Sequence, residues 1–213
     1  MIDARARFLA FCVPLLDEAL SPARFKRRGV KSGKYFRVLN EARQVLEIAI
    51  HVRPRYEPEA QLHVYPMVEA QMPSVNQIAL EMVRDKALLG NALEVTIRQP
   101  LEMTAPAAKQ RRWFVGGEDT YSDVSASIVE SVKNWGVPFF DDYRGPADLV
   151  RGYERSDPRL LVQQHFVVYV AAAYLLLGRT HDAESVLKNR LGSQGLQKRY
   201  ARAFEYVHGK ATS

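Results

Sequence analysis

Two histidines, His51 and His63, carry the clearest metal-binding chemistry in the chain. They fall in two stretches of alternating apolar and polar residues, and an antiparallel register that aligns the apolar faces puts them opposite each other on the polar face. Glu47 and Tyr65 would lie nearby. A metal site needs a third ligand, and two neutral imidazoles on a sheet face usually meet solvent. The spacing therefore favours an exposed polar face, and we expect no metal or cofactor.

The other reactive side chains fit structural roles. Cys12 lies on the apolar stripe of a helical pattern, where burial disfavours the thiolate that a nucleophile needs. Asp141 and Asp142, with Glu118 and Asp119 upstream, could bind a divalent cation, but adjacent acids in a polar loop are typical of solvated or helix-capping residues. The sequence contains no nucleophile elbow, phosphate loop, zinc-protease motif or Cys-x-x-Cys pattern. It therefore favours a protein that is not an enzyme.

A basic segment is the strongest charge feature. Between residues 24 and 37 no acid occurs, and the cations are Arg24, Lys26, Arg27, Arg28, Lys31, Lys34 and Arg37. Phe25, Tyr35 and Phe36 are interleaved with them, as on nucleic-acid surfaces where cations meet phosphates and aromatic rings stack on bases. In the competing interpretation, Phe25 and one of the other two rings enter the core while the cations stay solvated. Two further basic clusters are Lys109, Arg111, Arg112 and Lys188, Arg190, Lys198, Arg199, Arg202.

The composition is that of a globular protein. The chain has 213 residues, 47% of them hydrophobic, and a net charge of +6, which permits acidic partners. Its single cysteine excludes an intramolecular disulfide and fits a reducing compartment. An apolar run at residues 8–16 follows two arginines, but its helical spacing indicates a packed amphipathic helix rather than a secretory signal. No apolar run reaches the roughly 20 residues that span a bilayer, so we expect no membrane association and a cytoplasmic location.

The periodicity of apolar residues predicts an α+β fold. It indicates an N-terminal helix and a mainly antiparallel sheet of about five strands, near residues 35–39, 45–53, 62–68, 93–98 and 113–115. One helix is expected over 75–89, with Ser74 as its N-cap and Gly90 at its end, and another over 121–135, stopped by Gly136 and Pro138. A short helix is expected near 147–153, and a C-terminal helical layer follows, broken near Gly178 and again at 192–195. We divide the chain into an α+β domain, 1–145, and a helical region, 146–213, packed on it.

Residues 170–187 read as two helices folded back on each other. This hairpin resembles one tetratricopeptide unit, and the matching residues are Val170, Ala171, Tyr174, Gly178, Ala183 and Leu187. Arg190 stands where that repeat has a small residue, and the sequence holds no second copy. Because a solenoid needs about three units to bury its faces, the resemblance implies a packed helical pair and no repeat array.

The first two thirds of the chain resembles a bacterial family of unknown function, in which a helix leads into a basic segment, an aromatic strand and a long hairpin. The matching stretches are 15–16, 24–29, 35–37, 46–52, 112–113 and 135–140. Phe25 precedes Gly29 here, whereas that family places the glycine directly before the phenylalanine. The resemblance implies an α+β protein of the bacterial cytoplasm, and some proteins of this general build neutralise toxins. It implies no catalytic residues.

Our leading interpretation is a non-enzymatic protein–protein interaction module, immunity-like or an accessory factor. Its contact surfaces would be the basic segment and the exposed faces of the C-terminal helices. The alternative is a nucleic-acid-binding protein that uses the same basic segment. A third hypothesis places a small-molecule or enzymatic pocket between sheet and helices, around Trp113, Trp135 and Tyr143. The sequence defines no oligomeric state.

Overall fold

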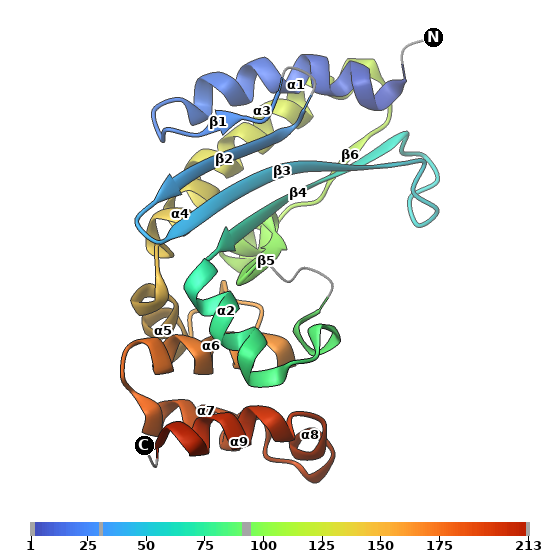
Figure 1. Ribbon diagram of the computed structural model, residues 1–213. Helices are drawn as coiled ribbons and strands as arrows, with labels where there is room; N and C mark the ends of the chain where they lie inside the picture. Colours follow the sequence, from blue (N-terminus) through green and yellow to red (C-terminus); the bar gives the residue numbers. More distant parts are fainter. Residues whose placement is uncertain (1–2, 30–31, 91–94, 212–213) are drawn as a thin grey trace. The chain divides into compact units, whose positions relative to one another are not determined.

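The computed structural model describes residues 3–29, 32–90 and 95–211. It confirms the predicted fold class, since an N-terminal helix and a mainly antiparallel sheet are followed along the chain by C-terminal helices (Figure 1). The predicted division after residue 145 stays a prediction. The chain gathers into two compact units, the first from Met1–Val38, Arg43–Glu69 and Arg98–Asp142, the second from Leu39–Ala42, Ala70–Ile97 and Tyr143–Ser213.

The sheet has six strands within the described ranges, in the order β1-β2-β3-β4-β5, and β6 also pairs with β4. Their bounds are β1 (Lys26–Arg27), β2 (Lys34–Leu39), β3 (Ala42–Val52), β4 (Leu62–Gln71), β5 (Ile97–Pro100) and β6 (Trp113–Val115). The predicted hairpin is confirmed as β3 and β4. The strand expected over 93–98 begins only at Ile97, and residues 93 and 94 lie outside the described part. β1 carries no sequence signal because two residues show no alternation.

Four of the helical segments that the structure describes in the first unit are short irregular turns. The longer elements are α1 (Ala4–Leu20), α3 (Tyr121–Ser131), the π-helical turn η5 (Val132–Gly136) and α4 (Val137–Asp142), with short 3₁₀ turns η2 (Leu101–Thr104), η3 (Ala107–Lys109) and η4 (Glu118–Thr120). The stop predicted at Gly136 and Pro138 is wrong. The Val137 amide donates to the Val132 carbonyl, a π-type bond that carries the helix onward. Gly136 instead provides room, because a Cβ there would lie 2.8 Å from Cδ1 of Leu101.

Helix α1 supplies much of the core of the first unit. It packs against α3, and Phe8, Cys12, Leu16 and Leu20 are buried along one stripe. The Tyr35 hydroxyl of β2 donates to a backbone carbonyl of α1 at 3.2 Å. Burial raises the pKa of the Cys12 thiol to about 11, which keeps it protonated at neutral pH. The interpretation of Cys12 as a core residue is therefore confirmed.

The second unit is helical. Its elements are α2 (Pro73–Val83), η1 (Lys86–Leu89), α5 (Pro146–Glu154), α6 (Gln164–Leu176), α7 (Thr180–Leu191), α8 (Gln194–Arg199) and α9 (Ala201–Ala211). Helix α6 is buried on all sides between residues 166 and 174 and packs against α2, α5 and α7. The predicted α6–α7 hairpin is confirmed, with Gly178 left-handed at φ 72° and Ala171 and Ala183 fully buried.

The helix predicted over 75–89 is shorter than expected. Helix α2 begins at Pro73, a residue suited to the first turn because it has no amide hydrogen to leave unbonded. Ser74 therefore lies inside the first turn and is not the N-cap. The helix ends at Val83, where Arg84 turns left-handed at φ 55°. Gly90, at φ 77°, closes the following turn η1 instead.

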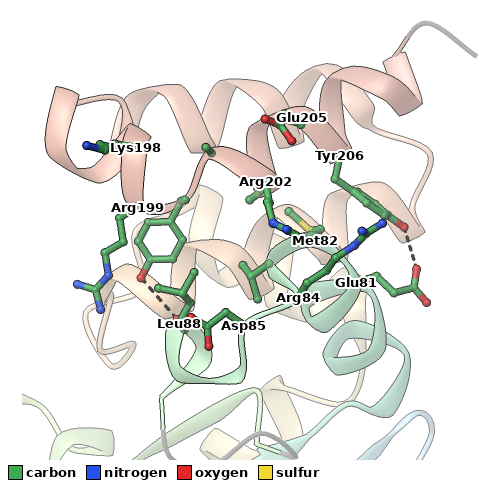
Figure 2. A pocket seen from close by; sticks show the side chains of 14 residues that line it. Glu81, Met82, Arg84, Asp85, Leu88, Lys198, Arg199, Arg202, Glu205 and Tyr206 are labelled. Carbon is green, nitrogen blue, oxygen red and sulfur yellow. Dashed lines mark hydrogen bonds between the residues drawn. The ribbon is translucent and has the colours of Figure 1, made fainter.

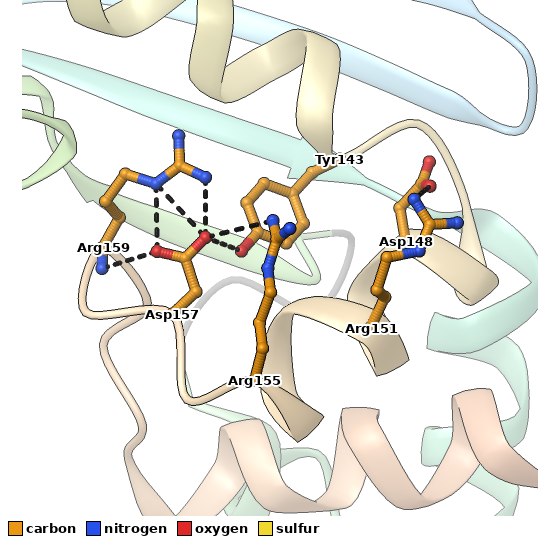
Figure 3. A network of polar contacts seen from close by, with 6 residues as sticks. All are labelled: Tyr143, Asp148, Arg151, Arg155, Asp157 and Arg159. Carbon is orange, nitrogen blue, oxygen red and sulfur yellow. Dashed lines mark hydrogen bonds and ion pairs between the residues drawn. The ribbon is translucent and has the colours of Figure 1, made fainter.

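The carboxylate of Asp157, a buried residue between α5 and α6, contacts Tyr143 before α5 and two arginines that follow α5 (Figure 3). The Arg159 guanidinium donates to it at 2.6 Å and the Tyr143 hydroxyl at 2.7 Å, while Arg155 lies 3.6 Å away. Burial by itself would raise the pKa of the Asp157 carboxyl. The hydrogen bonds from Arg159 and Tyr143 outweigh burial and lower this pKa to about 2. Tyr143 in turn packs against Gly152, where a Cβ would collide with the tyrosine ring.

We expect the free energy of unfolding to fall as the pH drops from about 4 towards about 2. The folded pKa of Asp157 is below its ordinary value of 3.8, so its stabilisation is complete above that value and is lost as the pH falls through the folded pKa. The difference corresponds to about 2 kcal/mol. Urea denaturation at a series of pH values measures this dependence. Asp157→Asn should be less stable at neutral pH and should flatten the profile; parallel profiles for the two proteins would contradict the assignment.

Candidate interaction groove

One member of the basic segment, Arg37, is buried and bound to other residues of the first unit. Its side chain is 8% exposed and lies over the Phe25 ring, with the guanidinium carbon 4.7 Å from the ring centroid. It donates to Gln44 Oε1 at 2.6 Å, to the Ala23 carbonyl at 3.0 Å and to Asp141 Oδ1 at 2.6 Å. These partners satisfy the charge within the first unit. Asp141, considered above as a cation ligand, is thereby engaged by an arginine.

The remaining basic residues divide into paired and unpaired groups. Arg27 pairs with Asp17 at 3.0 Å, and Lys34 pairs with Glu47 at 3.2 Å. Three others are exposed and form no ion pair within the described residues: Arg24, Lys26 and Arg28. Lys31 lies outside the described residues. Phe25 and Tyr35 are buried, as the competing interpretation expected. The structure thus leaves only part of the basic segment available to a partner.

The second unit contains a groove of about 970 Å³ between the α2–η1 segment and the α8–α9 segment (Figure 2). Met82 is fully buried beneath it. Two tyrosines connect its walls, because the Tyr200 hydroxyl donates to the Leu88 carbonyl at 3.5 Å and the Tyr206 hydroxyl donates to Glu81 at 2.9 Å. Burial and the Glu81 carboxylate raise the pKa of Tyr206, so this hydroxyl stays a donor. The walls are therefore held by hydrogen bonds that do not use the lining cations.

Cations line both walls of this groove. Arg84 comes from the end of α2, and Lys198, Arg199 and Arg202 come from α8 and α9. Arg199 approaches Gln164 at 3.4 Å. The other three are exposed and make no ion pair with any residue that the structure describes. They are Arg84, Lys198 and Arg202.

Within the described residues, the acids of the groove form no ion pair with these cations. Glu81 accepts the hydroxyl of Tyr206, and Asp85 accepts the Ala87 amide at 2.9 Å as the cap of η1. Glu205 is exposed on α9. A guanidinium offers a planar set of donors that matches a carboxylate in bidentate geometry. The cations of the groove are interspersed with its own carboxylates. The arrangement therefore suits a partner whose acidic side chains are separated from one another.

Sequence reasoning had found three of the four lining cations. Lys198, Arg199 and Arg202 belong to the third basic cluster, on C-terminal helices that were expected to be exposed. Arg84 was missed, because it is more than a hundred positions away in sequence. Its one local signal is an arginine directly after an apolar helical stretch. The fold, rather than the local sequence, brings Arg84 to the other three.

The other candidate residues lie elsewhere. His51 and His63 line one cavity of the first unit, where His63 Nδ1 is 2.6 Å from the Tyr56 hydroxyl. Across the described ranges, no group of three or more His, Cys, Asp or Glu side chains could hold a metal ion. Trp113 lines the same cavity as the histidines. Trp135 also belongs to the first unit, whereas Tyr143 belongs to the second.

Comparison with protein-family models, curated proteins and solved structures gave no match for this chain. The two resemblances noted in the sequence therefore stay predictions. In the described part of the chain, no helix combines the length and apolar character needed to cross a membrane.

The left-handed backbone conformation of Arg84, at the end of α2, can be tested by substitution. A side chain in the left-handed region costs about 1 kcal/mol, and glycine escapes that cost. We expect Arg84→Gly to be more stable than Arg84→Ala by about 1 kcal/mol in urea denaturation, because both variants remove the charge and only one removes the Cβ. Equal stability of the two variants would show that residue 84 does not adopt this conformation in solution.

Proposed function

We propose that this protein is a non-enzymatic interaction module that binds an acidic segment of a partner protein in the groove between α2–η1 and α8–α9. In a bacterial cytoplasm it would serve as an immunity-like or accessory factor. One observation carries the proposal: Arg84, Lys198 and Arg202 line a single groove without an ion-pair partner among the described residues.

The chemistry of the groove favours an acidic peptide over a nucleic-acid backbone. A phosphate backbone carries an unbroken row of negative charges, which the carboxylates of Glu81, Asp85 and Glu205 would repel. A peptide can place acidic side chains against the cations and polar or apolar ones against the carboxylates. Tyr200 is almost fully buried and offers no open ring face for base stacking.

The affinity of such a groove comes from several weak pairs. An exposed ion pair contributes about 0–1 kcal/mol, and its contribution decreases with salt. Three cations acting together raise the association rate and select the charge of the partner more than they strengthen the complex. The proposal therefore implies a salt-sensitive complex whose specificity depends on the spacing of acidic residues in the partner.

The second candidate function is nucleic-acid binding by the basic segment. Arg24, Lys26 and Arg28 support it, because they are exposed and form no ion pair within the described part of the first unit. Arg37 does not contribute, since its guanidinium is bound internally. This candidate predicts phosphate contacts only, without base recognition by the buried rings Phe25 and Tyr35.

The groove is tested with a fluorescently labelled glutamate-rich peptide in an anisotropy titration. The double variant Lys198→Gln, Arg202→Gln should bind it about 5- to 30-fold more weakly, the equivalent of about 1–2 kcal/mol for two pairs. Arg84→Gly should also weaken binding while keeping the fold. Lys188→Gln on α7 is the matched control, because Lys188 pairs with Glu184 at 2.8 Å and does not line the groove.

The same variants then serve in a nuclease-treated extract of the native cell. A partner protein captured by the wild type and by Lys188→Gln, but lost with the double variant, would support the proposal. Equal peptide binding by all four proteins would overturn it.

Binding by the basic segment is tested with a single-stranded oligonucleotide at several salt concentrations. The logarithm of the association constant should fall by about 0.7 per contacted phosphate for each tenfold rise in salt. Replacing Arg24, Lys26 and Arg28 with Gln should make this slope shallower by about 2. Retention of the wild-type protein on an anionic resin, with no binding in the titration, would exclude this second candidate.

A further inference from the structure

The first unit contains a small cavity with aromatic walls. It has a volume of about 250 Å³, and its rings come from the end of β3, the β3–β4 loop, the start of β4 and β6: His51, Tyr56, His63, Tyr65 and Trp113. Cavities for drug-sized ligands usually measure about 300–1,000 Å³. The size of this cavity therefore suits one ring system rather than a whole cofactor.

The rings are held in place and still open to solvent. His63 stacks on Phe114, its pairing partner in β6, with centroids 4.7 Å apart and ring planes 25° apart. The Tyr56 hydroxyl lies 2.6 Å from His63 Nδ1 and restrains both rings. Tyr65 lies 5.3 Å from His63. Tyr56 is 58% exposed and Tyr65 36% exposed, so part of each ring remains accessible to a ligand.

A charged pair lines the polar side of the same cavity. Arg112 Nε lies 3.9 Å from Glu102 Oε1, which is longer than a hydrogen bond. The Glu102 side chain is 21% exposed and the Arg112 side chain 69% exposed. Burial raises the pKa of Glu102 above its ordinary value, and the opposing effect of the Arg112 charge is smaller. Because the two groups approach without a close hydrogen bond to each other, a carboxylate acceptor and a guanidinium donor face the cavity side by side.

We propose that this cavity binds a single nucleobase, with its ring stacked on Tyr65 and its edge hydrogen-bonded to Glu102 and Arg112. Guanine fits this edge best. Its N1 and N2 hydrogens form two adjacent donors for one carboxylate, and its O6 and N7 atoms are the acceptors that arginine contacts in bidentate geometry. The site is separate from the groove of the second unit and does not depend on the function proposed above.

The base can come from a nucleic-acid strand or from a free nucleoside. Lys109 and Arg111 precede Arg112 in the chain, are exposed and form no ion pair within the described ranges. Cations next to an aromatic platform are the arrangement that holds the phosphates of a single strand while a base stacks. The shared chemistry is the guanine ring, so the experiment uses one probe of each kind.

The first probe is guanosine, whose lack of charge removes the general attraction to a basic protein; saturation-transfer NMR reports its binding. The second is a labelled single-stranded hexanucleotide with one guanine, read by fluorescence anisotropy. Tyr65→Ala should weaken the binding of whichever probe binds the wild type by about 5- to 150-fold, as expected for loss of one stacked base. Tyr65→Phe, which keeps the ring, should bind like the wild type.

Two further variants complete the design. Glu102→Gln should remove the preference for guanosine over uridine, because an amide presents one acceptor oxygen in place of two. Phe11→Ala is the matched control, since Phe11 is 45% exposed on α1 and does not line the cavity. Circular dichroism and thermal unfolding check that every variant is folded.

Each outcome decides the proposal. Binding of guanosine, of the strand or of both supports it when Tyr65→Ala loses binding and Tyr65→Phe retains it, and the probe that binds identifies the source of the base. Absence of binding to both probes would overturn it. Binding that is equal in the wild type, Tyr65→Ala and Glu102→Gln would place the ligand elsewhere and would overturn it too.

Discussion

The buried guanidinium of Arg37 holds three separate parts of the first unit together. A buried charge that loses its partners costs several kcal/mol, so each partner must be delivered with accurate geometry. Gln44 of β3, the Ala23 carbonyl after α1 and Asp141 at the end of α4 supply the acceptors. These acceptors come from three parts of the chain, and their meeting at one side chain sets the positions of strand, loop and helix. The second unit has a counterpart in Asp157, where the charge is negative and the donors are arginines and a tyrosine.

Local periodicity was enough to predict most of the elements. The β3–β4 hairpin could be predicted because its two apolar faces coincide in one register, and that register also brought His51 and His63 to one cavity. The α6–α7 hairpin could be predicted because Gly178 supplies a left-handed turn between two apolar stretches. The errors arose where a residue has two possible uses. Gly136 can end a helix, but here it makes room for Leu101 while a π-type bond carries the helix through.

The candidate sites were less predictable than the fold, because their residues are brought together only by tertiary packing. A run of cations in sequence gives no information on which of them have partners. Arg37 and Lys34 belong to one such run, yet Asp141 is 104 residues from the first and Glu47 is 13 residues from the second. Arg84 shows the reverse case. It is isolated from other basic clusters in sequence and joins a cationic groove only when α2 packs on α9. The sequence around Glu102 likewise does not indicate that its carboxylate lies near Arg112.

The net charge of +6 is therefore a poor guide to function until the paired cations are separated from the unpaired ones. Paired cations such as Arg37 and Arg159 stabilise the fold, and their charges are already compensated at short range. Unpaired cations set the electrostatic potential that a partner meets, and their position relative to carboxylates and aromatic rings decides which partner that is. Between carboxylates, as around Arg84, they suit separate acidic side chains. Beside open rings, as at Lys109 and Arg111, which precede the cavity residue Arg112 in the chain, they suit a phosphate that accompanies a stacked base. Under the two proposals, the same residue type would support a different kind of recognition in each unit, and the neighbours of each cation would make the distinction.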